Sequence, residues 1–91
     1  MAQFQISRHY TMPRTEVRAA AQSLASKIER EYGLRARWQD DSVRISGRGV
    51  DGVLSFGNGE IAVSVKLGIL ASVFESRLRH EIERYLDENV V

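Results

Sequence analysis

The sequence predicts a single α+β domain over residues 1–91, with the element order β-α-β-β-β-β-α. We expect a twisted, mainly antiparallel sheet with two helices packed on one face. Three observations lead to this prediction. Apolar and polar residues alternate in five short segments, as they do in half-buried strands. Two longer segments repeat their apolar residues with the period of an amphipathic helix. Asn58-Gly59, a pair strongly favoured in two-residue hairpin turns, lies between the last two strand segments.

The Asn58-Gly59 turn sets the register of a central hairpin over residues 50–67, which a second turn near Arg48-Gly49 precedes. The apolar side of this hairpin consists of Phe56 opposite Ile61, Leu54 opposite Val63, Gly52 opposite Val65 and Val50 opposite Leu67. The other side sets Asp51 opposite Lys66, an attractive pair of opposite charges. A shift of one residue would turn the apolar set toward water, so the sequence favours this register.

A strand and a helix come first along the chain. Residues 3–9 alternate between apolar and polar, which predicts a strand. The helix is expected from about Pro13 to Tyr32, because proline is tolerated in a first helical turn and Gly33 is suited to end a helix. Two places are open to the first strand. We prefer the sheet edge beside the last strand, and the alternative is parallel pairing beside residues 34–39.

Two further strands are joined by a turn at Asp40-Asp41. This turn sets Trp38 opposite Val43 on the apolar inner face. On the polar outer face it sets Arg37 opposite Arg44, and like charges in that position repel each other. The sequence therefore predicts four consecutive antiparallel strands over residues 34–67.

The last element is a helix over about residues 69–88 whose apolar residues do not share one stripe. Its buried stripe is expected to consist of Leu70, Phe74, Leu78, Ile82 and Tyr85. Ile69 and Val73 lie far around the helix from this stripe, so a straight helix leaves both exposed. Either the helix breaks near Glu75-Ser76, with Ser76 as the N-cap of the second piece, or Ile69 and Val73 belong to a contact surface.

The composition restricts the classes of function. The chain has 13 Lys and Arg against 12 Asp and Glu, a net charge of +1 that gives no strong attraction to nucleic acid or anionic lipid. It has no cysteine, which excludes disulfides, thiolate catalysis and sulfur-ligated metals. Its apolar runs are shorter than a signal-peptide core or a membrane span. We therefore expect a soluble, cytoplasmic protein.

No residue pattern in the chain points to catalysis. The two histidines, His9 and His80, are on different predicted elements, and we expect both at the surface. Residues 80–84 begin like the helix of a zinc protease, but Arg84 stands where the second histidine is required. The glycines are not followed by the lysine and hydroxyl residue of a phosphate-binding loop. We expect no enzyme activity, no cofactor and no metal.

Two surfaces are candidates for binding a partner, and the first is the polar face of the sheet. It carries Arg35, Arg37 and Arg44, here called the arginine face. The repulsion between Arg37 and Arg44 is relieved when an anion binds, so this face is the candidate for nucleic acid. The aromatic residues of the strands are assigned to the inner face, where they cannot stack on bases. Nucleic acid is therefore the less favoured partner.

The second surface is apolar and lies in the segment LGILASVF, residues 67–74. Core packing is expected to account for Leu67, Leu70 and Phe74. Ile69 and Val73, together with Ala71, are left as surplus apolar residues. Either core packing accounts for the whole segment, or the surplus forms a homodimer interface or a docking surface for another apolar partner.

Four segments carry a resemblance to a known family: YGLRARW (residues 32–38), RGVDGVL (48–54), VSVKLGIL (63–70) and IERYLDE (82–88). They resemble the small bacterial proteins described as polyhydroxyalkanoic acid system proteins, and the resemblance covers most of the chain. The histidine that this family has near the end of the first strand matches His9. The leucine expected shortly after it is replaced here in the run HYTM, so the resemblance assigns no role to His9.

The resemblance implies a non-catalytic accessory protein of polyhydroxyalkanoate storage, acting in granule association or in its regulation. The implied partners are the granule surface or a granule protein, and the implied location is at storage granules. A protein at such a surface needs an apolar contact surface rimmed by charge, for which Ile69, Leu70 and Val73 are the candidates. The alternative is a small nucleic-acid-binding regulator that uses the arginine face.

Overall fold

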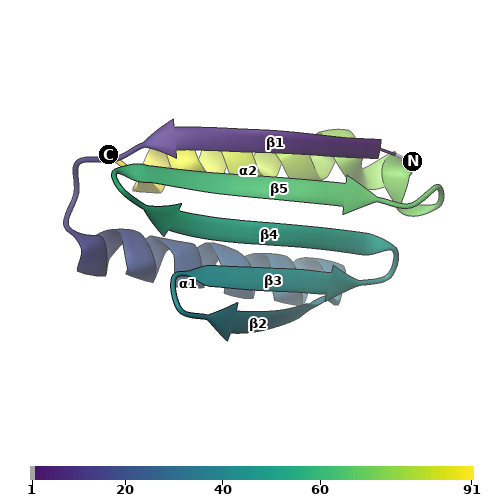
Figure 1. Cartoon of the computed structure of the whole chain (residues 1–91). Coiled ribbons are helices and arrows are strands. Elements are labelled where there is room, and N and C mark those ends of the chain that lie inside the picture. Colours follow the sequence, from purple (N-terminus) through teal and green to yellow (C-terminus); the bar gives the residue numbers. More distant parts are fainter. Residues whose placement is uncertain (1) are drawn as a thin grey trace.

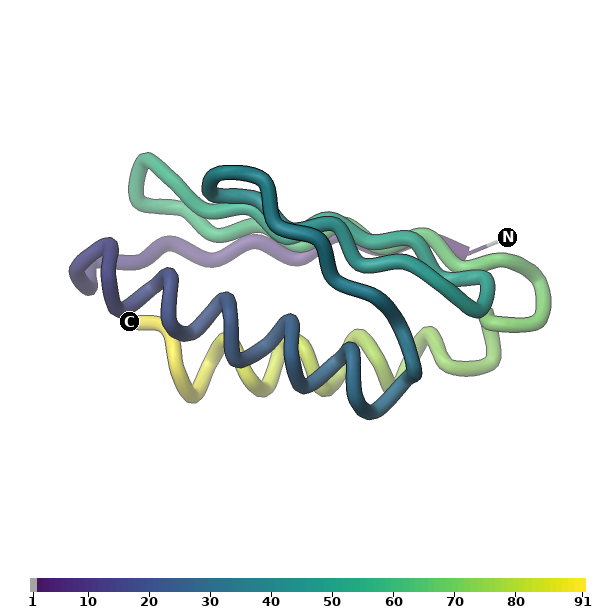
Figure 2. Tube along the Cα trace, turned by 90° about the horizontal axis from the view of Figure 1, so that it is seen from below, coloured from purple at the N-terminus to yellow at the C-terminus, as the bar shows by residue number. Residues whose placement is uncertain are grey.

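The computed structural model describes residues 2–91, which form one antiparallel sheet with two helices on one face (Figures 1 and 2). In chain order the elements are β1 (Ala2–His9), α1 (Arg14–Tyr32), β2 (Arg35–Gln39), β3 (Ser42–Gly47), β4 (Val50–Gly57), β5 (Glu60–Leu67), the 3₁₀ helix η1 (Ala71–Phe74) and α2 (Glu75–Asn89). The predicted α+β class and the predicted element order are confirmed.

The strands lie in the order β1-β5-β4-β3-β2, and every neighbouring pair is antiparallel. β1 therefore occupies the edge beside β5, the place that the sequence analysis preferred, and does not pair with β2 (Figure 1). The tube in Figure 2 shows the sheet as one layer and both helices as a second layer beneath it. Within residues 2–91, no helix covers the opposite face of the sheet (Figure 2).

Two-residue turns set the register of the sheet. Asn58 and Gly59 have φ values of 53° and 78°, and Arg48 and Gly49 have φ values of 50° and 81°. This left-handed backbone matches the twist of the strands on either side of each turn. The predicted pairs are all present: Phe56 with Ile61, Leu54 with Val63, Gly52 with Val65, Val50 with Leu67, Trp38 with Val43 and Arg37 with Arg44.

The core lies between the sheet and the two helices. Leu54 and Val63 of the central hairpin are buried under the helices, as the register requires. Leu24 of α1 and Ile82 of α2 are almost completely buried against the sheet. No polar or charged residue is buried among residues 2–91. The fold therefore rests on apolar burial by two helices against one face of a sheet.

The last helix begins later than the sequence predicts. A 3₁₀ turn precedes it, and α2 starts only at Glu75, close to the predicted break. Phe74 occupies the N-cap position, without a side-chain hydrogen bond to the helix. The prediction of Ser76 as the N-cap was therefore wrong, because Ser76 already lies inside the first turn of α2.

The predicted buried stripe of this helix was wrong in three places. Leu70 is 89% exposed and Phe74 is 45% exposed, whereas the smaller Ala71, which was counted with the surplus, is buried. Residues 71–74 form a 3₁₀ helix with three residues per turn, so the α-helical spacing that assigned Leu70 and Phe74 to the stripe does not extend over them. At the other end Leu86 is buried in place of Tyr85, which is only half-buried. The buried residues of α2 are Leu78, Ile82 and Leu86.

The charges on the outer face also pair differently from the prediction. Asp51 lies opposite Lys66 as expected, but its carboxylate accepts hydrogen bonds from Arg44 Nε (3.2 Å) and Nη2 (2.9 Å). The predicted Asp51–Lys66 ion pair is therefore wrong, because the guanidinium fork of Arg44 binds both oxygens at once. Asp51 thus relieves the repulsion between Arg37 and Arg44. Within residues 2–91, Lys66 has no carboxylate partner.

Two leucine truncations test where the apolar stripe of α2 begins. Leu86 is 1% exposed, so Leu86→Ala should lower the free energy of unfolding by about 2–5 kcal/mol through lost burial and the cavity left behind. Leu70→Ala should change it by less than about 0.5 kcal/mol, because Leu70 is surrounded by water. Urea denaturation of both variants measures the difference. Similar losses for the two variants would show that Leu70 packs into the core.

Candidate functional site

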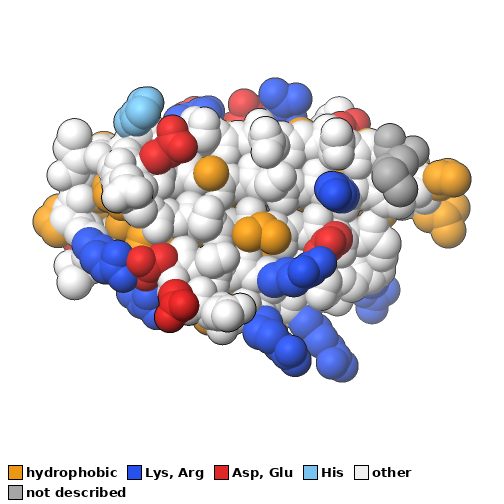
Figure 3. All heavy atoms as spheres, viewed as in Figure 1, with side chains coloured by type: hydrophobic (Ala, Val, Ile, Leu, Met, Phe, Trp, Pro, Cys, Tyr) orange, Lys and Arg blue, Asp and Glu red, His pale blue; other side chains and the backbone are white. Residues whose placement is uncertain are grey.

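The connection between β5 and α2, residues 68–74, forms a loop at one end of the molecule and is here called the contact loop (Figure 1). Its large apolar side chains face water: Ile69 is 79% exposed, Leu70 89% and Val73 77%. In Figure 3, orange side chains project past the right-hand end of the molecule, where Figure 1 places this loop. The three residues predicted as an apolar contact surface are thus brought together and exposed.

The contact loop is fixed to the turn between β3 and β4. The Gly68 N–H donates to the carbonyl of Gly49 (2.8 Å), and the Ser72 N–H donates to the carbonyl of Gly68 (2.9 Å). The Ser72 hydroxyl donates to the carbonyl of Ile69 (2.7 Å). Ala71 is buried against Gly49, where a β-carbon would lie 3.4 Å from the Ala71 methyl group. Because the backbone and Ala71 hold the loop, its large side chains point outward.

Phe74 joins the contact loop to the two helices. Its ring meets the ring of Tyr32 edge to face, with the centroids 6.3 Å apart and the planes at 79°. The Tyr32 hydroxyl donates to Glu81 Oε2 (3.3 Å), which links α1 to α2. Partial burial, together with the negative charge of Glu81, raises the pKa of Tyr32 to about 12. This end of the molecule is therefore held by aromatic packing and a hydrogen bond between helices.

Charged side chains form a rim beside the apolar ones. Arg48 and Arg77 line a shallow hollow next to Phe74, together with Glu31. Arg77 Nε lies 3.3 Å from Glu81 Oε1, and this hydrogen bond is the main reason that the pKa of Arg77 is raised. Sequence reasoning missed this rim. Its members come from α1, the β3–β4 turn and α2, and no local motif connects these segments.

The arginine face has the predicted geometry but lacks two features of a nucleic-acid site. Its three arginines are exposed and Arg37 lies opposite Arg44, yet Arg44 already binds Asp51. Trp38 lies on the inner face, with the guanidinium carbon of Arg18 5.5 Å from its ring centroid. The other strand aromatics, Phe4 and Phe56, are buried. None of the strand aromatics in residues 2–91 offers its ring face to a base on this side.

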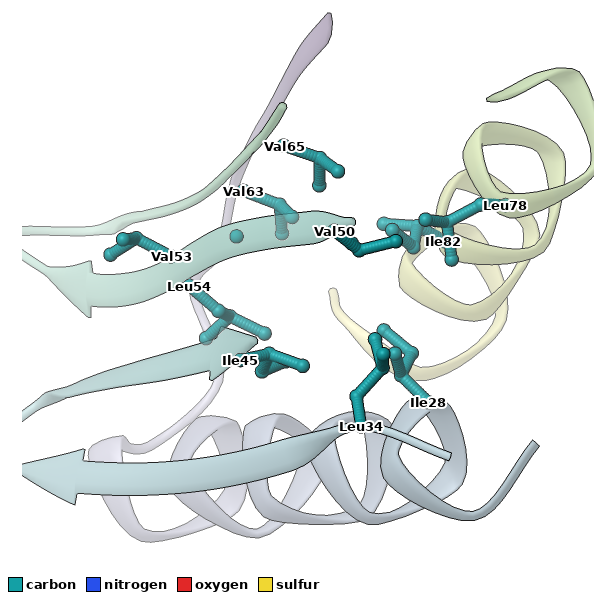
Figure 4. Close-up of a pocket in the computed structure, with 11 residues that line it drawn as sticks. Ile28, Leu34, Ile45, Val50, Val53, Leu54, Val63, Val65, Leu78 and Ile82 are labelled. Atoms are coloured by element: carbon teal, nitrogen blue, oxygen red, sulfur yellow. The ribbon is translucent and has the colours of Figure 1, made fainter. Parts of the chain in front are cut away.

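A small apolar cavity lies inside the core, between the sheet and the two helices (Figure 4). The cavity lies beside Gly52, which is the one inward-facing residue of β4 that has no side chain to fill the space. Ile28 of α1 and Ile82 of α2 face it from the other side. Its volume of about 20 Å³ is near the minimum for one water molecule, and its apolar lining offers a water no hydrogen bonds. This cavity is far too small for a substrate or cofactor.

The remaining candidate chemistry is dispersed over the surface. His9 and His80 are both exposed and lie on β1 and α2, as the sequence analysis expected. In the described part of the chain, no three His, Asp or Glu side chains lie close enough together to hold a metal ion. No helix within residues 2–91 combines the length and the apolar character needed to cross a membrane.

The raised pKa of Tyr32 leads to a stability prediction. The pKa of about 12 means that the folded protein keeps the phenolic proton to high pH, while the unfolded chain loses it near the usual tyrosine pKa of 10.0. The contribution of Tyr32 to folding is therefore complete below pH 10 and lost as the pH rises toward 12. We expect the urea midpoint of the wild type to fall more between about pH 9 and pH 11 than that of Tyr32→Phe. Equal falls would contradict this assignment.

A comparison with protein families identifies the chain. A family model with the description "Putative polyhydroxyalkanoic acid system protein" matches residues 4–90, nearly the whole chain. The matched region runs from β1 to the end of α2 and includes the contact loop. No curated protein matches the sequence. The resemblance seen in the four sequence segments is thus confirmed, and the chain belongs to the polyhydroxyalkanoic acid system protein family.

Proposed function

We propose that this protein is a non-catalytic accessory protein of polyhydroxyalkanoate storage that associates with granules through the contact loop. Membership of the polyhydroxyalkanoic acid system family supports the link to this polymer. The observation that carries the mode of action is the outward display of Ile69, Leu70 and Val73 by a loop whose backbone is fixed. Binding through these side chains places the protein at an apolar boundary while the charged remainder of its surface stays in water.

The size of the apolar surface indicates weak and reversible contact. Complete burial of one such side chain contributes roughly 1.5–3 kcal/mol. Three of them provide a gain comparable to the cost of association, which is at least about 4 kcal/mol for lost translational and rotational freedom. One contact loop therefore gives a low affinity, which is increased by charge or by several copies acting together.

The anchoring of the contact loop reduces the cost of binding. Gly68 and Ser72 already have backbone partners, and Ala71 is already packed against Gly49. The loop does not have to become ordered when it meets a surface, so little conformational entropy is lost. Adjacent large apolar side chains that stand in water are typical of interaction sites. This supports a contact function for the segment.

The absence of an evident site for chemistry in the described residues supports an accessory role over an enzymatic one. The internal cavity is apolar and holds at most about one water molecule. The hollow beside Phe74 is lined by Arg48, Arg77 and Glu31, but Arg77 is bound to Glu81. A catalytic site needs titratable groups that converge on a place for the substrate, and these groups do not.

Granule association is tested with a serine variant of the contact loop. Ile69→Ser, Leu70→Ser and Val73→Ser together remove the apolar display but leave the core untouched, because all three residues are exposed. In a polymer-producing bacterium, we expect the granule-bound fraction of the tagged variant to fall by about tenfold or more, as lost apolar burial requires. Fluorescence microscopy and co-sedimentation with isolated granules measure this fraction.

The matched control removes exposed apolar side chains elsewhere. Val53 on the outer face and Val91 at the chain's last position are exposed, so Val53→Ser with Val91→Ser makes a similar chemical change far from the contact loop. The control variant should bind granules like the wild type, and circular dichroism should show all three proteins folded. Unchanged granule binding by the contact-loop variant, or diffuse wild-type protein, would overturn the proposed function.

A further inference from the structure

We infer that the contact loop docks onto an anionic lipid surface, with the positively charged end of the molecule facing the lipid. This inference deepens the proposed function and rests on it, because it names the chemistry of the surface that the contact loop meets. The net charge of +1 conceals the feature that carries the inference. The charges are separated along the long axis of the molecule, and the contact loop projects from the positive end.

The sheet register shows how the charges are separated. Residues paired with one another across the sheet form rows that cross all five strands. One row consists of Gln5, Ser64, Val53, Arg44 and Arg37, and Leu54 belongs to the neighbouring row. A plane between these rows, continued through the midpoints of both helices, divides the molecule into two halves. The first half contains the contact loop, and the second contains both the β4–β5 turn and the C-terminus of α2.

The half with the contact loop is positive and the other half is negative. Of the 13 Lys and Arg in the chain, all but Arg8, Arg14, Arg18 and Arg84 lie in the contact-loop half. Of the 12 Asp and Glu, only Glu29, Glu31, Asp51, Glu75 and Glu81 lie there. The contact-loop half therefore has nine cations and five carboxylates, a net charge of +4, and the other half has a net charge of −3.

Part of this positive charge is exposed and forms no ion pair with a carboxylate of residues 2–91. Arg48 lies on the turn to which the contact loop is bound, and its guanidinium lies beside Gly33 at the C-terminus of α1. Lys66 is exposed just before the contact loop, and Asp51, the residue opposite, is already bound by Arg44. Figure 3 shows Lys and Arg side chains gathered over β2 and β3, toward the end from which the contact loop projects.

An anionic lipid surface matches both properties of this end of the molecule. Apolar side chains enter the boundary between headgroups and acyl chains, while nearby Lys and Arg meet the headgroup charges. The charge separation orients the protein as it approaches, because the negative end is repelled. The loop backbone enters this boundary with Gly68 and Ser72 already hydrogen-bonded, which avoids the cost of unpaired polar groups in lipid.

Charge complementarity favours this partner over a second copy of the chain. An end-to-end dimer through the contact loop would bring two ends of net charge +4 together, and like charges across an interface oppose association. A neutral polymer would make no use of Arg48, Lys66 or Arg35. An anionic lipid surface can contact the apolar side chains of the contact loop and the nearby cations at the same time.

Vesicle co-sedimentation tests the inference with the full-length protein. Vesicles of equal parts phosphatidylcholine and phosphatidylglycerol should bind the wild type at least about tenfold more tightly than vesicles of phosphatidylcholine alone. Added salt should weaken this binding. Ile69→Ser combined with Leu70→Ser should reduce it by about tenfold or more. Val53→Ser is the apolar control, since its side chain faces the outer surface of the sheet.

Two charge reversals test the orientation. Arg35 and Arg84 are both exposed and lie in opposite halves of the molecule, so Arg35→Glu and Arg84→Glu change the net charge equally. Arg35→Glu should weaken binding to the anionic vesicles, and Arg84→Glu should leave it nearly unchanged. Equal weakening by both reversals would show attraction to net charge alone and would overturn the inference.

The results separate this inference from the proposed function. Granule association that depends on Ile69 and Leu70, without a preference for anionic vesicles, would overturn the inference and leave the proposed function standing. Oriented binding to anionic vesicles, without granule association in cells, would overturn the proposed function and leave the lipid inference standing. A dimer in solution that Leu70→Ser dissociates would assign the contact loop to a second copy and would overturn the inference.

Discussion

A helix packed on a sheet can bury only one stripe of side chains, and this constraint determines the whole C-terminal part of the structure. In α2 that stripe consists of Leu78, Ile82 and Leu86. Before α2 the chain forms the 3₁₀ helix η1, and the buried residue there is Ala71. The larger apolar residues around Ala71 fall outside the stripe. Burial of the small residue against the sheet thus requires exposure of its large neighbours.

The β3–β4 turn holds the contact loop in place while its large side chains are exposed. Gly49 accepts the hydrogen bond from Gly68 and leaves room for the Ala71 methyl group. Because the backbone of the contact loop is satisfied there, the exposed side chains add no demand on the core. The same turn supplies Arg48, so apolar and positively charged groups meet at one end of the molecule. Local packing and surface chemistry therefore share one cause, the docking of the loop on this turn.

The sequence predicted the sheet well, because each of its features is local. Asn58-Gly59 marks the turn, and period-two alternation then fixes which residues face inward. Leu70 was misassigned because the prediction continued the stripe of α2 backward in steps of four residues, and nothing nearby in the sequence reveals the 3₁₀ turn. The partner of Asp51 could not be predicted from the residues directly opposite it, because Arg44 binds it diagonally from the neighbouring strand.

The central claim is that the apolar side chains of the contact loop stand in water while Ala71 holds the loop in place. Methyl NMR with a soluble paramagnetic agent measures this directly, because the agent broadens only signals that it can approach. We expect strong broadening for the methyl groups of Leu70 and Val73 and little for those of Ala71 and Leu78, at every protein concentration. Protected Leu70 methyl groups in the dilute, unbound protein would contradict the account.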